Sequence, residues 1–140
     1  MKKVAYWAIA AIFLCLTPAC NRRDFITNKV KEVVIFNTTA LNKPTLNMTS
    51  ADVLNCSKLV ISNRVQLDLI KNARKKNGVV LWKGSVKGIV VYEDGATENL
   101  RISDYGGFFM KENEQQVYQV VEGRDAWEQL LDSFLGTAIP

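Results

Sequence analysis

A chain of 140 residues, 48% of them hydrophobic, is long enough for one domain with a single core and too short for two ordinary domains. The formal charge of +4 is modest, and the chain contains no histidine, which excludes Ser-His-Asp and Cys-His catalysis and every metal site that needs imidazole. The three cysteines, at positions 15, 20 and 56, include no Cys-x-x-Cys pair, so neither a four-cysteine zinc site nor thioredoxin-type redox chemistry is expected.

The first 19 residues have the composition of a secretory signal peptide. Lys2 and Lys3 form a positive start, residues 4–16 are an uncharged apolar run, and the small residues Thr17-Pro18-Ala19 follow. The apolar run is shorter than the roughly 20 residues that a transmembrane helix needs. We therefore expect residues 1–19 to be removed as a leader, with an uncleaved membrane anchor as the alternative.

The end of this leader, Leu16-Thr17-Pro18-Ala19-Cys20, resembles the lipobox of bacterial lipoproteins. Ala19 and Cys20 match the small residue and the modified cysteine of that motif, whereas Thr17 and Pro18 depart from its usual leucine and small residue. The resemblance implies cleavage between Ala19 and Cys20, a diacylglycerol on the Cys20 sulfur, acylation of the new amine and thus a firm membrane anchor. The alternative is ordinary signal-peptidase cleavage at the same bond, which leaves Cys20 free to form a disulfide with Cys56.

Removal of Lys2 and Lys3 with the leader lowers the formal charge to +2, so the working protein is nearly neutral. We expect an exported, lipid-anchored envelope protein with a polar tether over residues 20–29 and one globular domain over residues 30–140. Asn21 is not the aspartate associated with inner-membrane retention in enterobacterial lipoproteins, which favours the outer membrane.

The first half of the domain predicts short elements and one longer helix. Residues 33–36 form an apolar, partly β-branched run typical of a strand, Thr49 or Ser50 is expected to cap a helical turn over 51–54, and 58–61 predicts a second short strand. A helix is expected over 64–76, with Asn63 as N-cap and Gln66 at the capping-box position. Its expected apolar face consists of Val65, Leu69 and Ala73, flanked by Leu67 and Ile70. Asn77-Gly78 is the expected C-terminal stop.

The second half predicts consecutive strands and a final helix. We expect strands over 79–83, 86–93, 97–103, 108–110 and 116–121, with Asp94-Gly95 and Tyr105-Gly106-Gly107 as turns. A terminal helix is expected with Asp125 as its cap and Glu128 at the capping-box position. Its core-facing stripe is Trp127, Leu130, Leu131, Phe134 and Leu135. The expected fold is α+β: an antiparallel sheet of about four to six strands with two helices packed on one face, an architecture that resembles many small exported bacterial proteins.

Few residues suggest chemistry. Glu93, Asp94, Glu98 and Asp104 are the densest acidic group, and carboxylates about 5 to 10 Å apart can hydrolyse glycosides, but a hairpin tip normally exposes its charges to solvent. Asp104 with Tyr105 could form a binding edge, although a simple strand connection is the expected role. No phosphate-binding glycine motif occurs, and we expect no catalytic residues, cofactor or metal.

Three further features have simple structural interpretations. Cys56 is expected to be an inert thiol, and Arg74-Lys75-Lys76 to be solvated at the end of its helix, which argues against nucleic-acid binding. The following aromatics are expected mainly in the core, with some on a binding face if one side of the sheet is open: Trp82, Tyr92, Phe108, Phe109, Tyr118 and Trp127.

Together these patterns favour a non-enzymatic envelope lipoprotein that contacts the membrane through its lipid and binds another protein, for example as an inhibitor or immunity protein. A periplasmic carrier of a small ligand and a structural subunit of an envelope assembly are the alternatives.

Overall fold

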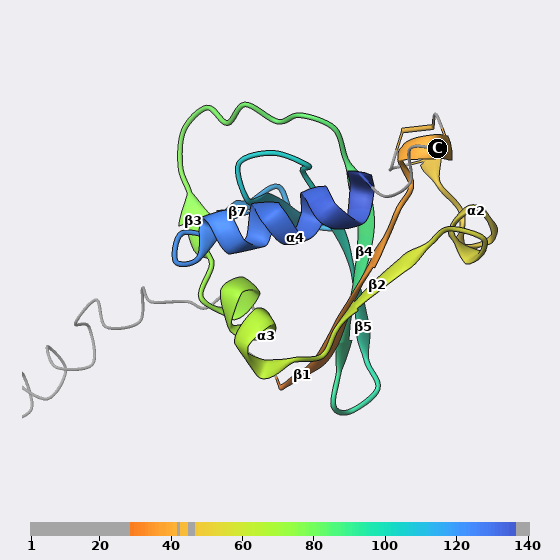
Figure 1. Ribbon diagram of the computed structural model, residues 1–140, viewed down its shortest axis with the longest axis horizontal. Coiled ribbons are helices and arrows are strands. Elements are labelled where there is room, and N and C mark those ends of the chain that lie inside the picture. Colours follow the sequence, from red (N-terminus) through yellow and green to blue (C-terminus); the bar gives the residue numbers. More distant parts are fainter. Residues whose placement is uncertain (1–28, 42, 45–46, 137–140) are drawn as a thin grey trace, which may run out of the picture.

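The segments in which apolar and polar residues alternate form a single antiparallel sheet (Figure 1). The computed structural model describes residues 29–41, 43–44 and 47–136. The expected leader, Ala19 and Cys20 lie outside these residues. The sheet has seven strands in the order β2-β1-β4-β5-β6-β7-β3. The strands are β1 (Val30–Phe36), β2 (Lys58–Ile61), β3 (Arg74–Lys76), β4 (Val86–Tyr92), β5 (Thr97–Ile102), β6 (Phe108–Lys111) and β7 (Val117–Gln119). The helices are the 3-10 turn η2 (Thr39–Leu41) and the α-helices α2 (Ser50–Leu54), α3 (Arg64–Lys71) and α4 (Arg124–Gly136).

The central strands show why the sheet has one buried face. In β4, Val86, Val90 and Tyr92 are buried and alternate with less buried neighbours, as the period of two in a strand requires. Val90 lies opposite Val33 of β1, so the buried residues of neighbouring strands share one face, here called the inner face. The Asp94-Gly95 turn joins β4 to β5 as expected, with Gly95 in the left-handed region at φ 87°.

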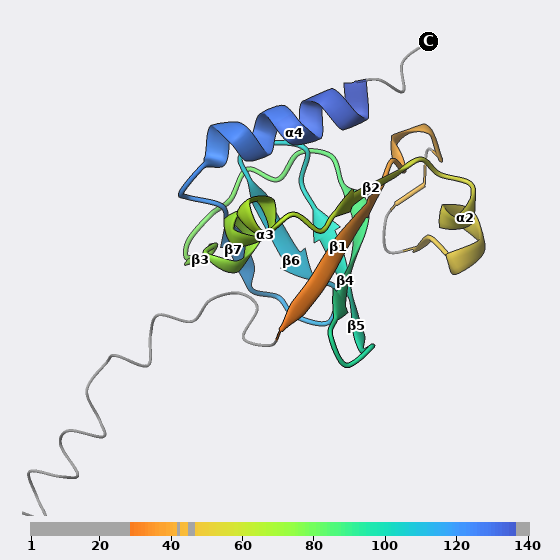
Figure 2. The same ribbon diagram turned by 60° about the horizontal axis from the view of Figure 1, so that its bottom comes forward.

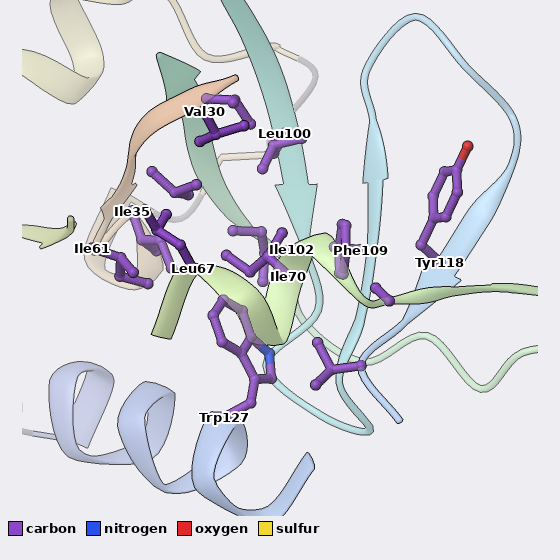
Figure 3. Close-up of a cluster of buried hydrophobic side chains, with 14 of the residues drawn as sticks. Val30, Ile35, Ile61, Leu67, Ile70, Leu100, Ile102, Phe109, Tyr118 and Trp127 are labelled. Atoms are coloured by element: carbon purple, nitrogen blue, oxygen red, sulfur yellow. The ribbon is translucent and has the colours of Figure 1, made fainter. Parts of the chain in front are cut away.

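Helices α3 and α4 both pack on the inner face (Figure 2). Leu67 and Ile70 of α3 and Trp127 and Leu131 of α4 are buried with the inner residues of the sheet, and Figure 3 shows Trp127 pointing from α4 toward Ile70. The remaining residues of the predicted stripe on α4, Leu130, Phe134 and Leu135, pack against this core from partly buried positions, so that stripe is confirmed. None of the helices in the described ranges has the length and apolarity that crossing a bilayer demands.

The α+β class and the antiparallel sheet are confirmed, but the expected counts were too low. The sheet has seven strands instead of four to six, and α2, which lies beyond the end of β2 and away from the other two, is a third α-helix (Figure 1). Thr49 caps α2 as predicted: its side chain accepts from the Asp52 N–H, and the Asp52 carboxylate accepts in return from the Thr49 N–H.

The predicted helix over 64–76 is wrong in its second half. Asn63 caps α3 by accepting from the Val65 N–H, but the helix ends at Lys71 with Asn72 as C-cap. Arg74-Lys75-Lys76 then forms β3, antiparallel to β7, and is therefore an edge strand instead of a helix end. These three residues favour helices intrinsically, so pairing with β7 overrides their propensity.

One residue of the expected apolar face is wrong: Val65 is 74% exposed. The other four contact the core, since Leu67, Ile70 and Ala73 are buried and Leu69 packs against them, although Ala73 lies after the end of α3. Gly78 adopts φ 85°, but it follows a strand and stops no helix.

Two further expectations in the second half are wrong. Residues 79–83 form no strand, and the two neighbours of β4 are β1 and β5. Helix α4 begins at Arg124, two residues earlier than a cap at Asp125 implies, so Asp125 lies in the first turn instead. The Gly123 carbonyl accepts from the Trp127 N–H. Glu128 pairs with Arg124 at 3.8 Å.

Candidate functional site

The sheet has two ends with different contents. At one end, the Lys29 carbonyl, just before β1, accepts from the Glu93 N–H in the β4–β5 hairpin. The opposite end, here called the loop end, carries η2, α2, the irregular segment 77–85 and the β5–β6 turn over 103–107, all in the upper half of Figure 1. The irregular chain at the loop end is where a binding surface is most readily built.

Ser103 joins the segment 77–85 to the β5–β6 turn. Its hydroxyl, fully buried, donates to the Lys83 carbonyl at 2.7 Å and accepts from the Tyr105 N–H at 3.3 Å. The Ser103 N–H donates to the Phe108 carbonyl at 2.9 Å, which closes the turn. Two loops 20 residues apart are thereby held by one side chain.

Ser85 provides a second attachment for the same segment. Its hydroxyl oxygen accepts from Trp82 Nε1 at 2.8 Å and from Arg101 Nε at 3.0 Å. The Arg101 guanidinium lies 5.0 Å from the centroid of the Trp82 ring, a cation–π contact with a residue of β5. The segment 77–85 is therefore attached to the sheet by side chains, although it forms no strand.

These attachments present four side chains to solvent, here called the Tyr105 platform: Leu81, Lys83, Asp104 and Tyr105. Tyr105 is 51% exposed and Leu81 is 63% exposed, and the Lys83 ammonium lies 5.0 Å from the centroid of the Tyr105 ring. Gly84 lies against the Asp104 carboxylate, where a Cβ would overlap the carboxylate oxygens. The platform thus combines an aromatic ring, an aliphatic chain and both signs of charge.

Such a combination suits protein recognition. Exposed tyrosine supplies a large amphipathic contact area with little side-chain entropy to lose, and tyrosine is enriched among residues that dominate interface energies. Because the two loops are already hydrogen-bonded to each other, binding requires little further ordering of the backbone. Sequence reasoning identified Asp104 and Tyr105 as a potential binding edge, but it assigned Leu81 and Lys83 to a strand and so missed them.

Asp104 is not brought to the other three acidic residues of the predicted group. Glu93 and Asp94 occupy the hairpin turn, where an Asp94 oxygen accepts from the Ala96 N–H at 2.9 Å, and Asp104 lies at the loop end. Glu98, near the hairpin, is separated from Asp104 by most of β5, a distance of about 13 Å at the usual rise of a strand. That separation exceeds the range of glycosidase carboxylate pairs.

Glu98 instead belongs to a hydrogen-bonded cluster on the inner face. It accepts from the Tyr92 hydroxyl and pairs with the Lys111 ammonium at 3.1 Å, and Lys111 also lies 3.7 Å from Glu114. Burial, and then the hydrogen bond to Glu98, raise the pKa of Tyr92. Lys111 thus lies between the two carboxylates of a structural ion-pair cluster.

Cys56 lies beside a small pocket at the loop end. Its thiol is half-buried and lies 3.5 Å from the Asp52 carbonyl oxygen. The pocket has a volume of about 210 Å³ and is lined by Asn37, Ala40, Leu41, Asp52, Asn55, Cys56 and Ser57. Most small-molecule sites are larger, roughly 300–1,000 Å³, so the pocket lends little support to the small-ligand carrier. Within the described ranges, no three residues among Cys, Asp and Glu are grouped to hold a metal ion.

The aromatic residues divide between core and surface. Trp82 is half-buried against Arg101, and the other five expected in the core are buried: Tyr92, Phe108, Phe109, Tyr118 and Trp127. Phe109 and Tyr118 stack with ring centroids 6.0 Å apart. The half-exposed aromatic ring of the Tyr105 platform is therefore not part of an exposed aromatic sheet face.

Comparison of the chain with models of protein families, with characterised proteins and with solved structures finds no match in any of the three. Its function is therefore inferred from its own residues.

Proposed function

We propose that this chain is a lipid-anchored bacterial envelope protein that binds another protein, without catalysis, through the Tyr105 platform. The observation that carries the proposal is the position of the platform. It lies at the end of the sheet opposite to Lys29, where the described chain begins. An inhibitor or immunity protein is the class of binding module that this arrangement suits.

The leader supports the anchoring half of the proposal. Cys20 follows Ala19 in the lipobox-like sequence, and nine residue steps separate it from Lys29. Such a tether spans at most about 30 Å when extended. A chain held at Cys20 would enter β1 at the membrane side of the domain and direct the loop end away from the lipid surface, toward a partner in the periplasm or outside the cell. The outer membrane is the favoured location.

The residues of the platform define the chemistry of the partner. The Tyr105 ring and Leu81 suit an apolar or aromatic partner surface, and the exposed Lys83 ammonium suits a carboxylate at its rim. Truncation of a tyrosine at the centre of an interface typically costs about 2 kcal/mol or more of binding free energy. Binding is therefore expected to depend strongly on Tyr105.

Site-specific photo-crosslinking in intact bacteria tests the binding half. A photoreactive amino acid at position 81 is expected to give a discrete crosslinked protein that Tyr105→Ala removes. The matched control places the same probe at Val65, which is 74% exposed on α3 at a distance from the platform. Equal crosslinking from both positions, or crosslinking that persists in Tyr105→Ala, would contradict the proposal.

Mass spectrometry of the N-terminal peptide tests the anchoring half independently. The expected result is an acylated peptide that begins at Cys20 and disappears in Cys20→Ser. An unmodified N-terminus with a Cys20 to Cys56 disulfide would instead make the protein a soluble exported domain. An intact Met1 would make the leader a retained anchor.

A further inference from the structure

The two edges of the sheet differ in how well they are protected against pairing with a strand of another chain. β3 forms one edge, and its three residues, Arg74-Lys75-Lys76, are all exposed cations. β2 forms the other edge and carries a single cation, Lys58, and the half-exposed aliphatic residue Val60. Consecutive lysine and arginine residues are a common device against pairing of an edge with another chain, because they repel and solvate it. β3 has this protection and β2 lacks it.

The hydrogen-bond register shows which backbone groups β2 leaves unpaired. The Asn37 N–H donates to the Ser57 carbonyl at 2.9 Å, and this pair continues the register of Phe36 with Lys58. Because hydrogen-bonded and non-hydrogen-bonded pairs alternate in an antiparallel ladder, Leu59 and Ile61 bond to β1. The N–H and C=O groups of Lys58 and Val60 therefore point outward from the sheet, and none of the described strands pairs with them.

The side chains along this edge indicate the chemistry of a strand that would pair with it. Val60 is 51% exposed and lies across from Val34 on the outer face of the sheet, where Val34 also faces Ile89. The Lys58 ammonium lies 5.8 Å from the Phe36 ring centroid, and no described carboxylate forms an ion pair with it. The edge thus offers an aliphatic row and one cation without a counter-ion among the described residues.

We propose that β2 binds an extended segment of a partner protein as an eighth strand of the sheet. The segment pairs with the outward N–H and C=O groups of Lys58 and Val60, places a carboxylate near Lys58 and sets aliphatic side chains beside Val60. In strand addition of this kind, the main-chain hydrogen bonds supply affinity and the alternate side chains supply specificity. This site is separate from the Tyr105 platform, and neither proposal depends on the other.

Binding of synthetic ten-residue peptides tests the site. The protein is expressed from the full chain and used in the form that the bacterial host produces. In one set valine and threonine alternate and two glutamates occupy varied positions; in the matched set lysines replace the glutamates. The glutamate set is expected to contain peptides that bind at least tenfold more tightly than their lysine counterparts. These peptides should slow hydrogen exchange of the Lys58 and Val60 amides, measured by NMR, and leave the amides of β3 unchanged.

Two variants isolate the backbone and the charge. Val60→Pro removes one outward N–H donor without removing a hydrogen bond to β1, so it should weaken binding of the glutamate peptides at least tenfold. The control Val60→Thr keeps the N–H and should bind these peptides as the parent does. If Val60→Pro fails to fold, Lys58→Glu serves instead and should reverse the preference toward the lysine peptides.

Several results would overturn the proposal. The first two are equal binding of the glutamate peptides by Val60→Pro and Val60→Thr, and an unchanged preference of Lys58→Glu for glutamate over lysine peptides. The other two are slower hydrogen exchange at the amides of β3 when peptide is added, and no binding of any glutamate peptide at millimolar concentration. Protection of the Lys58 and Val60 amides by dimerisation of the protein alone would also overturn it, because the occupant of the edge would then be a second copy of the chain.

Discussion

At the scale of single residues, Asp52 shows how one carboxylate organises the start of a short helix. One of its oxygens accepts from the Thr49 N–H at 2.7 Å, and the other lies 3.0 Å from the Lys43 ammonium. These bonds, with the Thr49 backbone bond as the largest cause, lower the pKa of Asp52 from 3.8 to about 2. A helix of five residues has few internal hydrogen bonds, so α2 depends on this cap.

The lowered pKa predicts a pH dependence. Because the carboxylate is more acidic in the folded chain than in the unfolded chain, its stabilising contribution is complete above about pH 4 and is lost as the pH falls toward 2. Asp52→Asn should therefore unfold at a lower temperature than the parent at pH 6, and the difference should shrink between pH 4 and pH 2. Thermal unfolding followed by circular dichroism measures it, with Asp132→Asn, an exposed carboxylate of α4, as control. A constant difference from pH 6 to pH 2 would contradict this role.

At the scale of elements, the segment 77–85 depends on tertiary contacts for its shape. Its backbone has no strand partner. The Ser103 hydroxyl donates to one of its carbonyls, that of Lys83, and the Ser85 hydroxyl accepts from the side chains of Trp82 and Arg101. Local sequence favours a strand over 79–83 because valine and leucine predominate there. The segment forms none, and β4, the next strand along the chain, pairs with β1 and β5 instead.

Ser103→Ala tests this dependence. The substitution leaves the Lys83 carbonyl without its partner and should lower the free energy of unfolding by about 1 kcal/mol, more if water does not reach that carbonyl. Hydrogen exchange should accelerate over residues 77–85, as mass spectrometry of their peptides would show. The control Ser133→Ala changes an exposed serine of α4 and should leave both measurements unchanged. Unaltered exchange in Ser103→Ala would show that the segment is held in another way.

The residues after α3 also take their conformation from tertiary contacts: their composition favours a helix, but they form strand β3. Asn63 was identified as a cap from sequence because its side chain acts within two residues of itself. The end of the helix at Lys71 was not identified, since Arg74-Lys75-Lys76 continues the helical composition. Its strand conformation arises from pairing with β7, more than 40 residues further along the chain.

At the scale of the whole molecule, α4 closes the inner face of the sheet. Trp127 and Leu131 are each only 1% exposed, and they meet residues contributed by strands and by α3. Leu131→Ala would leave a cavity in this core and should lower the free energy of unfolding by about 2–5 kcal/mol. Urea denaturation followed by tryptophan fluorescence measures the loss.

A matched substitution at the surface gives the reference for that loss. Leu54→Ala removes the same atoms from a side chain that is 69% exposed at the end of α2, and it should change the stability by no more than about 0.5 kcal/mol. Similar losses of unfolding free energy in Leu131→Ala and Leu54→Ala would mean that Leu131 stabilises the fold no more than an exposed leucine does. The slope of unfolding against urea should be unchanged in both.

Sequence alone determined the features whose causes lie within a few residues of each other. These include the α+β class, the Thr49 and Asn63 caps, the Asp94-Gly95 hairpin, the stripe on α4 and the exposed turn at Asp104 and Tyr105. Capping, turn formation and hydrophobic periodicity are local effects, so a single sequence displays them directly.

Only the tertiary structure decided which strands form edges, that Arg74-Lys75-Lys76 is one of them, and that Lys83 lies beside Tyr105. Each of these outcomes depends on groups far apart in the chain, such as the Ser103 hydroxyl and the Lys83 carbonyl. A backbone group takes whichever partner the completed fold brings to it, and no local pattern of residues specifies that partner.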